Sequence, residues 1–407
     1  MGILHKKKNV AIIEKGVYEY ENGQKYKIGF SGDKDDFVVI SHPEEEKKED
    51  ELIKDILKEN KNEIHDISFI NDYSYLLVGC NKGLLYVYKR IINNKANLKF
   101  EEITHFTPHK ESIIQITKLQ SGHILTLSSD SSSKILEIQI DTNGVLYQNE
   151  HKCEIIQLLL EENESSNNSA IELESGNLII SQGYFINFFE KIKNKGNIPI
   201  NKSNYSTNSL SGKEFHLTKK ILTNSDNIFF VEIDYKTVVA SQVSNQTLQF
   251  YNMDNFSLVN NINKIEFNNM KNSMCLINKE TLAIGSNKGS IYLINILRKQ
   301  LFVEISFDNC NCISSIKSID NETIIMGCQY WDTNYDVVIC KINNYKFKEI
   351  KRSQKAHNGL INDIKLITMN ISQNKNPFTE KYNVITLGYD YKAKVILDKN
   401  EKNDKII

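Results

Sequence analysis

One short pattern recurs along the chain and limits the folds that it can adopt. Residues 76–90 read LLVGCNKGLLYVYKR, and residues 282–296 read LAIGSNKGSIYLINI. Each copy has an apolar run, a glycine, a small residue, Asn-Lys-Gly and a second apolar run with aromatic residues, which is typical of a β-hairpin. Weaker copies begin at five further residues: Ile124, Leu178, Val238, Ile324 and Val384.

The spacing of these hairpins predicts a repeat architecture. Successive copies begin 42 to 60 residues apart, which is room for four short strands and their turns. One four-stranded sheet cannot bury both of its faces, whereas sheets stacked radially bury each other and leave only short edges. Leucine-rich repeats are shorter than this period, and the 3.6-residue periodicity of helical solenoids is absent.

We therefore predict an all-β fold of four-stranded antiparallel units, most simply seven, with eight as the alternative. Residues 1–48 contain strand-like runs, so they form either an N-terminal extension or a degenerate extra unit. The repeat domain is expected at 49–400, with a short tail at 401–407. Residues 51–58, ELIKDILK, are predicted to supply the outer strand of the last unit, because pairing the first and last elements removes two open edges.

Composition narrows the possible settings of the protein. The formal charge of −1 gives no basic field for nucleic acid, and no run approaches the ~18 apolar residues of a membrane span. The first residues contain no apolar segment typical of a secretion signal. The seven cysteines are scattered and odd in number, which favours reduced thiols in the cytoplasm. We expect a cytoplasmic protein without direct nucleic-acid contact or membrane insertion.

Two sets of residues link the repeat to a known family. His109 lies 21 residues before Asp130, and Thr126 lies on the predicted strand between them. In this spacing, over about residues 51–398, the chain resembles the WD40 β-propeller family. There, a histidine, a hydroxyl and an aspartate join a tryptophan of the third strand in a hydrogen-bonded network that locks each blade. By this resemblance, a second set is formed by His357, Thr386 and Asp390.

The chain departs from the family pattern at several positions. No Gly-His dipeptide precedes Lys110, and the third-strand tryptophan is missing in every unit. The one Trp-Asp pair, Trp331-Asp332, lies in a predicted turn instead of at the end of a strand.

Three long polar segments interrupt the period. We predict 161–170 between the first and second strands of the third unit, 192–213 between its third and fourth strands, and 368–382 between the first and second strands of the seventh. All three would then leave the same face of a propeller. They represent either drift in unconstrained loops or a partner site.

Residues 329–336, QYWDTNYD, form an enlarged turn in the sixth unit, which we predict on the opposite face. Aromatic side chains at loop tips are the kind that contribute most energy to protein interfaces. The candidate partner-binding residues are therefore Tyr330, Trp331, Asp332 and Tyr335. The alternative is that Trp331 folds back over the neighbouring unit.

No catalytic motif accompanies the repeat. The sequence lacks phosphate-binding glycine loops, a nucleophile elbow and a zinc-protease motif, and its nine histidines are dispersed. The only close cysteine pair, Cys310-x-Cys312, has no second pair or histidine at zinc-like spacing. We predict no catalytic, cofactor-binding or metal-binding residues, no small-molecule substrate and no enzymatic activity.

The resemblance implies a non-catalytic protein–protein interaction scaffold. Such a subunit would belong to a larger intracellular assembly of the ciliary or cytoskeletal, trafficking or ribonucleoprotein kind. The first alternative is a substrate-recognition module such as a ubiquitin-ligase receptor, which predicts a basic or aromatic pocket at the channel rim. The second alternative is a propeller enzyme, which would need convergent His, Asp or Glu side chains in the channel. Because propellers host many functions, these statements rest on analogy of fold.

Overall fold

The protein is described here by a computed structural model, which is almost entirely β-strand. The structure describes residues 16–19, 25–30, 38–41, 53–55, 62–70, 74–92, 98–140, 152–161, 166–192, 214–267, 272–330, 334–343, 346–368 and 382–396. It divides into two units, one of Asp55–Val395 and one of Met1–Lys54 with Ile396–Ile407. Within these described ranges, no helix is long and apolar enough to cross a membrane.

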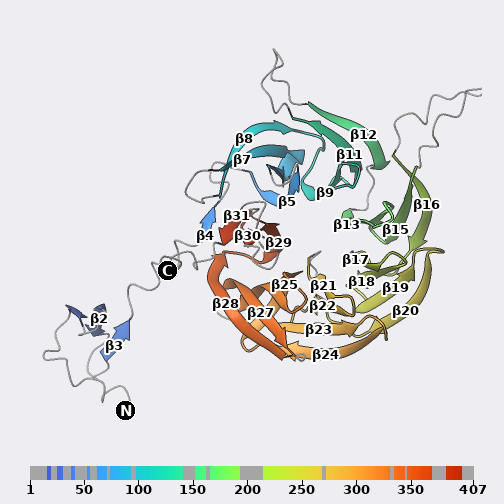
Figure 1. The fold of residues 1–407 in the computed structure, drawn as a ribbon. Helices are drawn as coiled ribbons and strands as arrows, with labels where there is room; N and C mark the ends of the chain where they lie inside the picture. The colour runs from blue at the N-terminus through green and yellow to red at the C-terminus, as the bar shows by residue number, and fades with distance from the viewer. Residues whose placement is uncertain are drawn as a thin grey trace, which may run out of the picture. The chain divides into compact units, whose positions relative to one another are not determined.

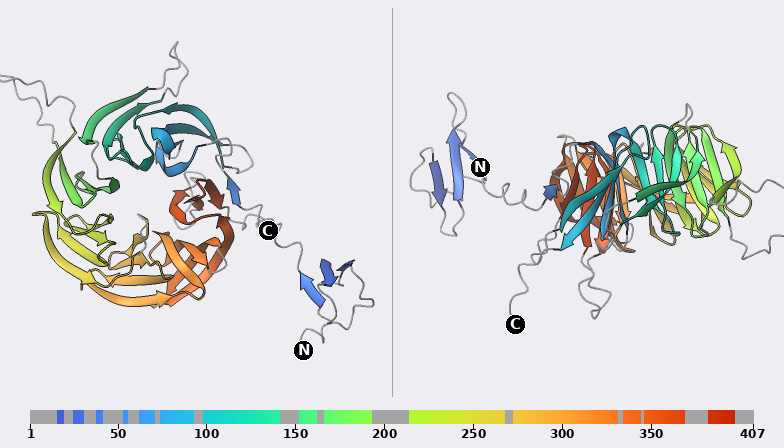
Figure 2. Two further views of the ribbon diagram at one scale, coloured as in Figure 1. Left: turned by 180° about the vertical axis from the view of Figure 1, so that it is seen from behind. Right: turned by 90° about the horizontal axis from the view of Figure 1, so that it is seen from above.

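Seven four-stranded antiparallel sheets form a β-propeller, and Figure 1 shows them around a ring. The same ring is seen from behind in Figure 2. Blade 1 is β5 (Ile64–Ile70), β6 (Tyr75–Cys80), β7 (Leu85–Ile92) and β8 (Leu98–Phe106). Blade 2 is β9 (Ile113–Lys118), β10 (Ile124–Ser128), β11 (Ser133–Gln139) and β12 (Lys152–Leu160). Blade 3 is β13 (Asn167–Glu172), β14 (Leu178–Gln182), β15 (Phe185–Lys191) and β16 (Phe215–Leu222).

Blades 4 to 6 continue in the same order. Blade 4 is β17 (Ile228–Asp234), β18 (Thr237–Gln242), β19 (Thr247–Asn252) and β20 (Ser257–Asn263). Blade 5 is β21 (Met274–Asn278), β22 (Thr281–Gly285), β23 (Ser290–Asn295) and β24 (Gln300–Ser306). Blade 6 is β25 (Cys310–Ser318), β26 (Thr323–Tyr330), β27 (Tyr335–Asn343) and β28 (Lys346–His357). Blade 7 is β29 (Ile361–Thr368), β30 (Tyr382–Gly388), β31 (Ala393–Ile396) and β4 (Ile53–Asp55).

We name the strands of a blade a to d from the innermost to the outermost. Successive a strands contact each other around the ring, and β30 of blade 7 contacts β5 of blade 1. The fourth strand of blade 7 is β4, which confirms that 51–58 supplies an outer strand to the last unit. Seven is therefore the number of blades. Strands β1 (Gly16–Glu19), β2 (Lys25–Phe30) and β3 (Val38–Ser41) form a three-stranded sheet in the other unit. Whether residues 1–48 are an extension or a degenerate extra unit stays a prediction.

All seven sequence hairpins are confirmed as the b–c hairpins of the blades. Their starting residues lie in β6, β10, β14, β18, β22, β26 and β30. Every residue of β6 and of β10 is buried, because a b strand is covered on both faces by neighbouring blades. This double burial explains why the b strands are continuous apolar runs instead of alternating ones. By contrast, the outer strand β20 is mostly exposed.

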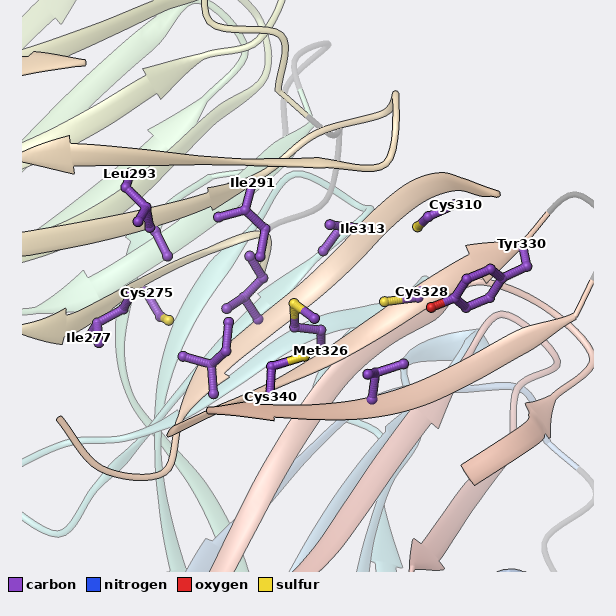
Figure 3. Close-up of a cluster of buried hydrophobic side chains, with 14 residues drawn as sticks. Cys275, Ile277, Ile291, Leu293, Cys310, Ile313, Met326, Cys328, Tyr330 and Cys340 are labelled. Carbon is purple, nitrogen blue, oxygen red and sulfur yellow. The ribbon is translucent and has the colours of Figure 1, made fainter. Parts of the chain in front are cut away.

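The cores lie between blades, as Figure 3 shows for blades 5 and 6. Ile291 and Leu293 of β23 pack with Ile313 of β25 and Met326 of β26. This cluster also contains four cysteines, and every cysteine of the chain has a free thiol: Cys80, Cys153, Cys275, Cys310, Cys312, Cys328 and Cys340. Burial raises the pKa of the Cys275 and Cys340 thiols to about 12, so that both stay protonated and pack as small apolar groups.

One predicted position in the chain is wrong. The segment 161–170 does not lie between the a and b strands of blade 3, because its last residues, from Asn167 on, belong to the a strand β13. Strand β12, with the apolar run 155–160, resembles an inner strand in sequence but is the outer strand of blade 2. Its Ile155 and Leu158 are about half exposed. The connection from 161 to 166 is therefore a d–a connection, which belongs to the opposite face from a–b and c–d turns.

The other two long segments follow strands as predicted. The segment 192–213 joins β15 to β16, a c–d connection, and 368–382 joins β29 to β30, an a–b connection. Both belong to the face of the a–b and c–d turns, which we call the lower face. Residues 193–213 and 369–381 of these segments lie outside the described part of the chain.

Deleting residues 195–212 is expected to leave the propeller folded, with a change in unfolding free energy of less than about 1 kcal/mol. Lys191 pairs with Phe215, and the Ile192 N–H donates to the Glu214 carbonyl oxygen at 2.8 Å, so the stem is closed before the deleted part begins. The shortened loop keeps residues 193, 194 and 213 between these partners, a length common in hairpins. Urea unfolding followed by circular dichroism checks this. Loss of soluble protein would show that the deleted residues belong to the core.

Candidate functional site

The structure brings together the first predicted histidine set in the blade 2 network, which we define as His109, Thr126, Asp130 and Ser132. His109 lies between blades 1 and 2, with Nε2 2.8 Å from Thr126 Oγ1 and Nδ1 2.9 Å from Ser132 Oγ. The Ser132 hydroxyl donates to Asp130 Oδ1 at 2.6 Å, and Asp130 Oδ2 lies 3.4 Å from His109 Nδ1. The network therefore joins the b strand, the b–c turn and the connection entering the blade.

Asp130 is held in its ionised form. Burial by itself raises the pKa of this carboxyl, but hydrogen bonds from Ser132 and from the Lys110 N–H, together with His109, outweigh burial and lower the pKa to about 2. The Asp130 side chain is only 4% exposed. Removing the carboxylate would therefore leave buried donors without an acceptor.

The second predicted set forms the blade 7 network of His357, Thr386 and Asp390. His357 Nδ1 lies 2.8 Å from Asp390 Oδ1, and Nε2 lies 2.9 Å from Thr386 Oγ1. Asp390 Oδ2 also accepts from the Asn358 N–H at 3.1 Å. Burial opposes ionisation of Asp390, but the hydrogen bond and charge of His357 hold its pKa at about 2. That either network locks its blade stays a prediction.

A lysine of the c strand takes part in the blade 2 network. Lys134 is the register partner of Thr126 on the c strand, and its carbonyl oxygen accepts from Thr126 Oγ1 at 3.3 Å. Lys134 Nζ donates to the Pro108 carbonyl oxygen at 2.7 Å, next to His109. In blade 7, the Lys394 carbonyl oxygen accepts from Thr386 Oγ1 at 3.5 Å. The sequence contains this signal, because a lysine lies four residues after the aspartate in both sets.

Acid is expected to destabilise the propeller through these two aspartates. Each pKa is lowered from 3.8 to about 2 on folding, so the stabilisation is complete above about pH 4 and is lost as the pH falls through 2. The loss is about 2 kcal/mol for each group. Urea midpoints between pH 4.5 and 2 check this, with Asp130→Asn expected to flatten the profile. The same substitution at exposed Asp254 is the control, and equal flattening in both variants would contradict the prediction.

The candidate partner-binding turn of blade 6 differs from the sequence expectation. Tyr330 is the last residue of β26 and is 7% exposed, with the Arg352 guanidinium over its ring at 4.4 Å. Arg352 is held there by Glu349 and Asp336, at 2.6 and 3.6 Å. The Arg352 cation therefore covers the Tyr330 ring, and a role of Tyr330 in partner binding stays a prediction. Tyr335 begins β27 and is partly buried, and Trp331 and Asp332 lie outside the described residues.

Other aromatic side chains are exposed on the upper face, which we define as the face of the b–c and d–a turns. Tyr389 and Tyr391 flank Asp390 in the b–c turn of blade 7 and are 45% and 38% exposed. The ring of His65 in blade 1 meets Tyr391 edge to face at 5.5 Å. In blade 3, Tyr184 is 51% exposed. Sequence reasoning missed these tyrosines, although two of them lie beside a predicted network residue.

The outer strands expose large apolar side chains on consecutive blades. The most exposed are Ile155 and Leu158 of β12, Leu217 and Leu222 of β16, Leu258 and Val259 of β20, Leu301 and Phe302 of β24, and Ile350 of β28. Blades 4 and 5 are also joined there, because Asn260 Nδ2 donates to the Lys299 carbonyl oxygen at 2.8 Å. We call Leu258, Val259, Leu301 and Phe302 the blade 4–5 outer surface.

The centre of the ring contains a cavity of about 380 Å³. Its polar lining includes Asp66, Gln115, Lys118, Asp363 and Lys365, all from a strands. Among the residues that the structure describes, no three or more His, Cys, Asp or Glu side chains are arranged to hold a metal ion.

Comparison with known proteins identifies the fold of the chain but assigns it to no family. No protein-family model matches the chain, and no curated protein matches it by sequence. Among solved structures, 1414 chains match, which is consistent with a fold used for many purposes. One is the crystal structure of Saccharomyces cerevisiae Sqt1, with a TM-score of 0.55 and 12% identity, covering 86% of this chain and 98% of that chain. At this identity the similarity shows a shared β-propeller fold alone.

Proposed function

We propose that the protein is a WD40-like, non-catalytic scaffold that binds other proteins within a larger intracellular assembly. The observation that supports this most is the exposure of apolar side chains on the outer strands. On the blade 4–5 outer surface, four aliphatic and aromatic side chains are 41% to 49% exposed. The cores of protein interfaces use such side chains, and apolar surface that would stay in water when the protein is alone is stabilised when a partner covers it.

Other parts of this proposal follow from the same features. The protein would act in the cytoplasm, where its free thiols stay reduced. It would have no enzymatic activity, because its buried histidines are engaged in the two blade networks. Residues 1–48 and 401–407 would be extensions of a propeller domain at 49–400. The assembly would be of the ciliary or cytoskeletal, trafficking or ribonucleoprotein kind.

Affinity purification of the tagged full chain from its own cells, followed by mass spectrometry, tests the scaffold. We expect stoichiometric co-purifying proteins with the wild type, and a loss of at least one with Leu301→Ser/Phe302→Ser. The matched control is Lys346→Ser/Lys348→Ser, which changes two exposed positions on the outer strand of blade 6. Recovery of the wild-type protein alone would contradict the proposal.

The exposed tyrosines of the upper face favour one second function, a substrate-recognition module. Tyrosine supplies a large contact area with a polar end and is common at binding hot spots. A recognition module would lose varied, substoichiometric partners with Tyr389→Ala/Tyr391→Ala and keep them with the outer-strand variant. The scaffold predicts the reverse, so the same experiment separates the two functions.

A further inference from the structure

The central cavity lies where six of the seven blades approach the axis of the ring. Its lining comes from the a strands β5, β9, β13, β17 and β29 and from Asn272, just before β21. Its volume of about 380 Å³ lies within the range of small-molecule sites, which is roughly 300–1,000 Å³. The a strands point short polar and charged side chains at this space, including Ser68 and Thr117.

The two carboxylates of the cavity wall are already engaged by the protein. Asp66 is 1% exposed, and its Oδ2 accepts from the Ile116 N–H of the next blade at 2.7 Å. Asp363 is 3% exposed, and its Oδ1 accepts from the Ile364 N–H at 2.8 Å. Its Oδ2 lies 2.8 Å from Lys365 Nζ. Both acids are therefore buried and hydrogen-bonded within the protein, and the charge of Asp363 is compensated by Lys365.

The cations of the wall are more accessible than the acids. The Lys365 side chain is 30% exposed. Burial by itself lowers the pKa of Lys365, but the charges of Asp363 and Asp66 outweigh it and raise the pKa, so the ammonium group stays charged. Lys118 is exposed, and its Nζ forms no hydrogen bond or ion pair with any residue in the described part of the chain. Lysines of blades 2 and 7 thus line one cavity.

A hydroxyl donor completes this set. Thr117 Oγ1 accepts from Gln115 Nε2 at 3.1 Å, which leaves the hydroxyl proton of Thr117 to be donated elsewhere. Gln115 itself is fixed by Ala170 of blade 3, through its Nε2 to the carbonyl oxygen at 2.8 Å and its Oε1 from the N–H at 3.0 Å. The donor is therefore held in position by two neighbouring blades, as a preorganised site requires.

We propose that the central cavity binds a small anion that carries a phosphate or carboxylate group, held by Lys118, Lys365 and Thr117. Ammonium and hydroxyl donors with engaged carboxylates match an acceptor-rich ligand, because charge-assisted hydrogen bonds to phosphate and carboxylate oxygens are the strong ones. The volume admits inorganic phosphate or a compact phosphorylated or dicarboxylate metabolite. This ligand role is additional to the scaffold and does not depend on it.

Calorimetric titration and thermal unfolding of the full chain test the site. The probes are inorganic phosphate and malonate, which separate the two ligand chemistries, with sodium chloride at matched ionic strength as the reference. We expect saturable binding of one probe and a rise in melting temperature beyond that in chloride. Lys118→Gln should weaken binding about tenfold, the effect of losing one charge-assisted hydrogen bond. Thr117→Val should weaken binding by a smaller factor. Both variants should weaken the binding of the same probe, the one that the wild type binds.

The matched control is Lys317→Gln, which removes an exposed lysine from the a strand of blade 6 that does not line the cavity. It should bind the probe as the wild type does. Lys118 was chosen for the test because Lys365→Met would leave two buried acids without their cation and endanger the fold. The proposal is overturned if neither probe exceeds chloride, or if Lys118→Gln and Lys317→Gln weaken binding equally.

Discussion

Replacing Gly289 by alanine is expected to destabilise the propeller by about 3 kcal/mol or more. Gly289 ends the Asn-Lys-Gly turn of blade 5 with φ of +72°, in the left-handed region that side chains disfavour. A Cβ atom there would lie 2.0 Å from the Cys310 carbonyl oxygen and 2.5 Å from its carbon. Both are backbone atoms at the start of blade 6, so the two blades would have to move apart. A lowered midpoint of urea unfolding, with soluble protein, checks the prediction.

Gly122→Ala is the control for Gly289→Ala. Gly122 also has a positive φ, +91°, but nothing lies within 4 Å of its added Cβ. Alanine at this position should lower the free energy of unfolding only by the cost of a left-handed backbone for a residue with a Cβ atom, about 1–2 kcal/mol. The excess in Gly289→Ala therefore measures the close approach of the next blade. Equal effects of the two substitutions would mean that blade 6 does not press on this turn.

Asp130→Ala is expected to destabilise the protein by about 2–3 kcal/mol, near the upper range for stranding buried partners. The substitution removes acceptors for the Ser132 hydroxyl at 2.6 Å and for the N–H groups of Lys110 and Ser132, both at 2.9 Å. It also removes the negative charge beside buried His109. The measurements are the melting temperature and the urea midpoint.

Asp254→Ala provides the comparison for Asp130→Ala. Asp254 pairs with Lys236 at 3.5 Å, but both side chains are about half exposed or more, so the loss should be less than about 1 kcal/mol. An unchanged melting temperature in Asp130→Ala would reject the role of the blade 2 network in stability. A loss in both variants of similar size would show a general charge effect instead.

The glycine that ends each Asn-Lys-Gly turn explains why this pattern was the most informative stretch of the sequence. Gly83 has φ of +69°, and its added Cβ would lie 1.9 Å from the His109 carbonyl oxygen. In blades 1 and 5 alike, the turn glycine thus lies against the backbone of the chain that enters the next blade, too close to admit a side chain. The sequence repeat therefore reflects a contact that is repeated between blades. Because that contact admits no side chain, both turns contain glycine at the same place, and the hairpins could be recognised from it.

The histidine networks could be predicted from spacing, whereas the surface residues could not. A network depends on residue types at fixed strand positions, so His109, Thr126 and Asp130 were found together from the chain alone. Whether an aromatic ring is exposed depends on what packs over it. Tyr330 lies under Arg352, which comes from β28, 22 residues later in the chain, and no local pattern encodes that cover.

The sequence by itself determined the strand-rich repeat, its seven b–c hairpins, the closing outer strand and the two histidine networks. These depend on local periodicity and turn chemistry, which each unit carries within itself. Only the tertiary structure decided which apolar strand faces water, as β12 does, and that Lys118 and Lys365 meet at one cavity. Those features arise where blades meet around the ring, because closure brings together side chains separated by more than 200 residues.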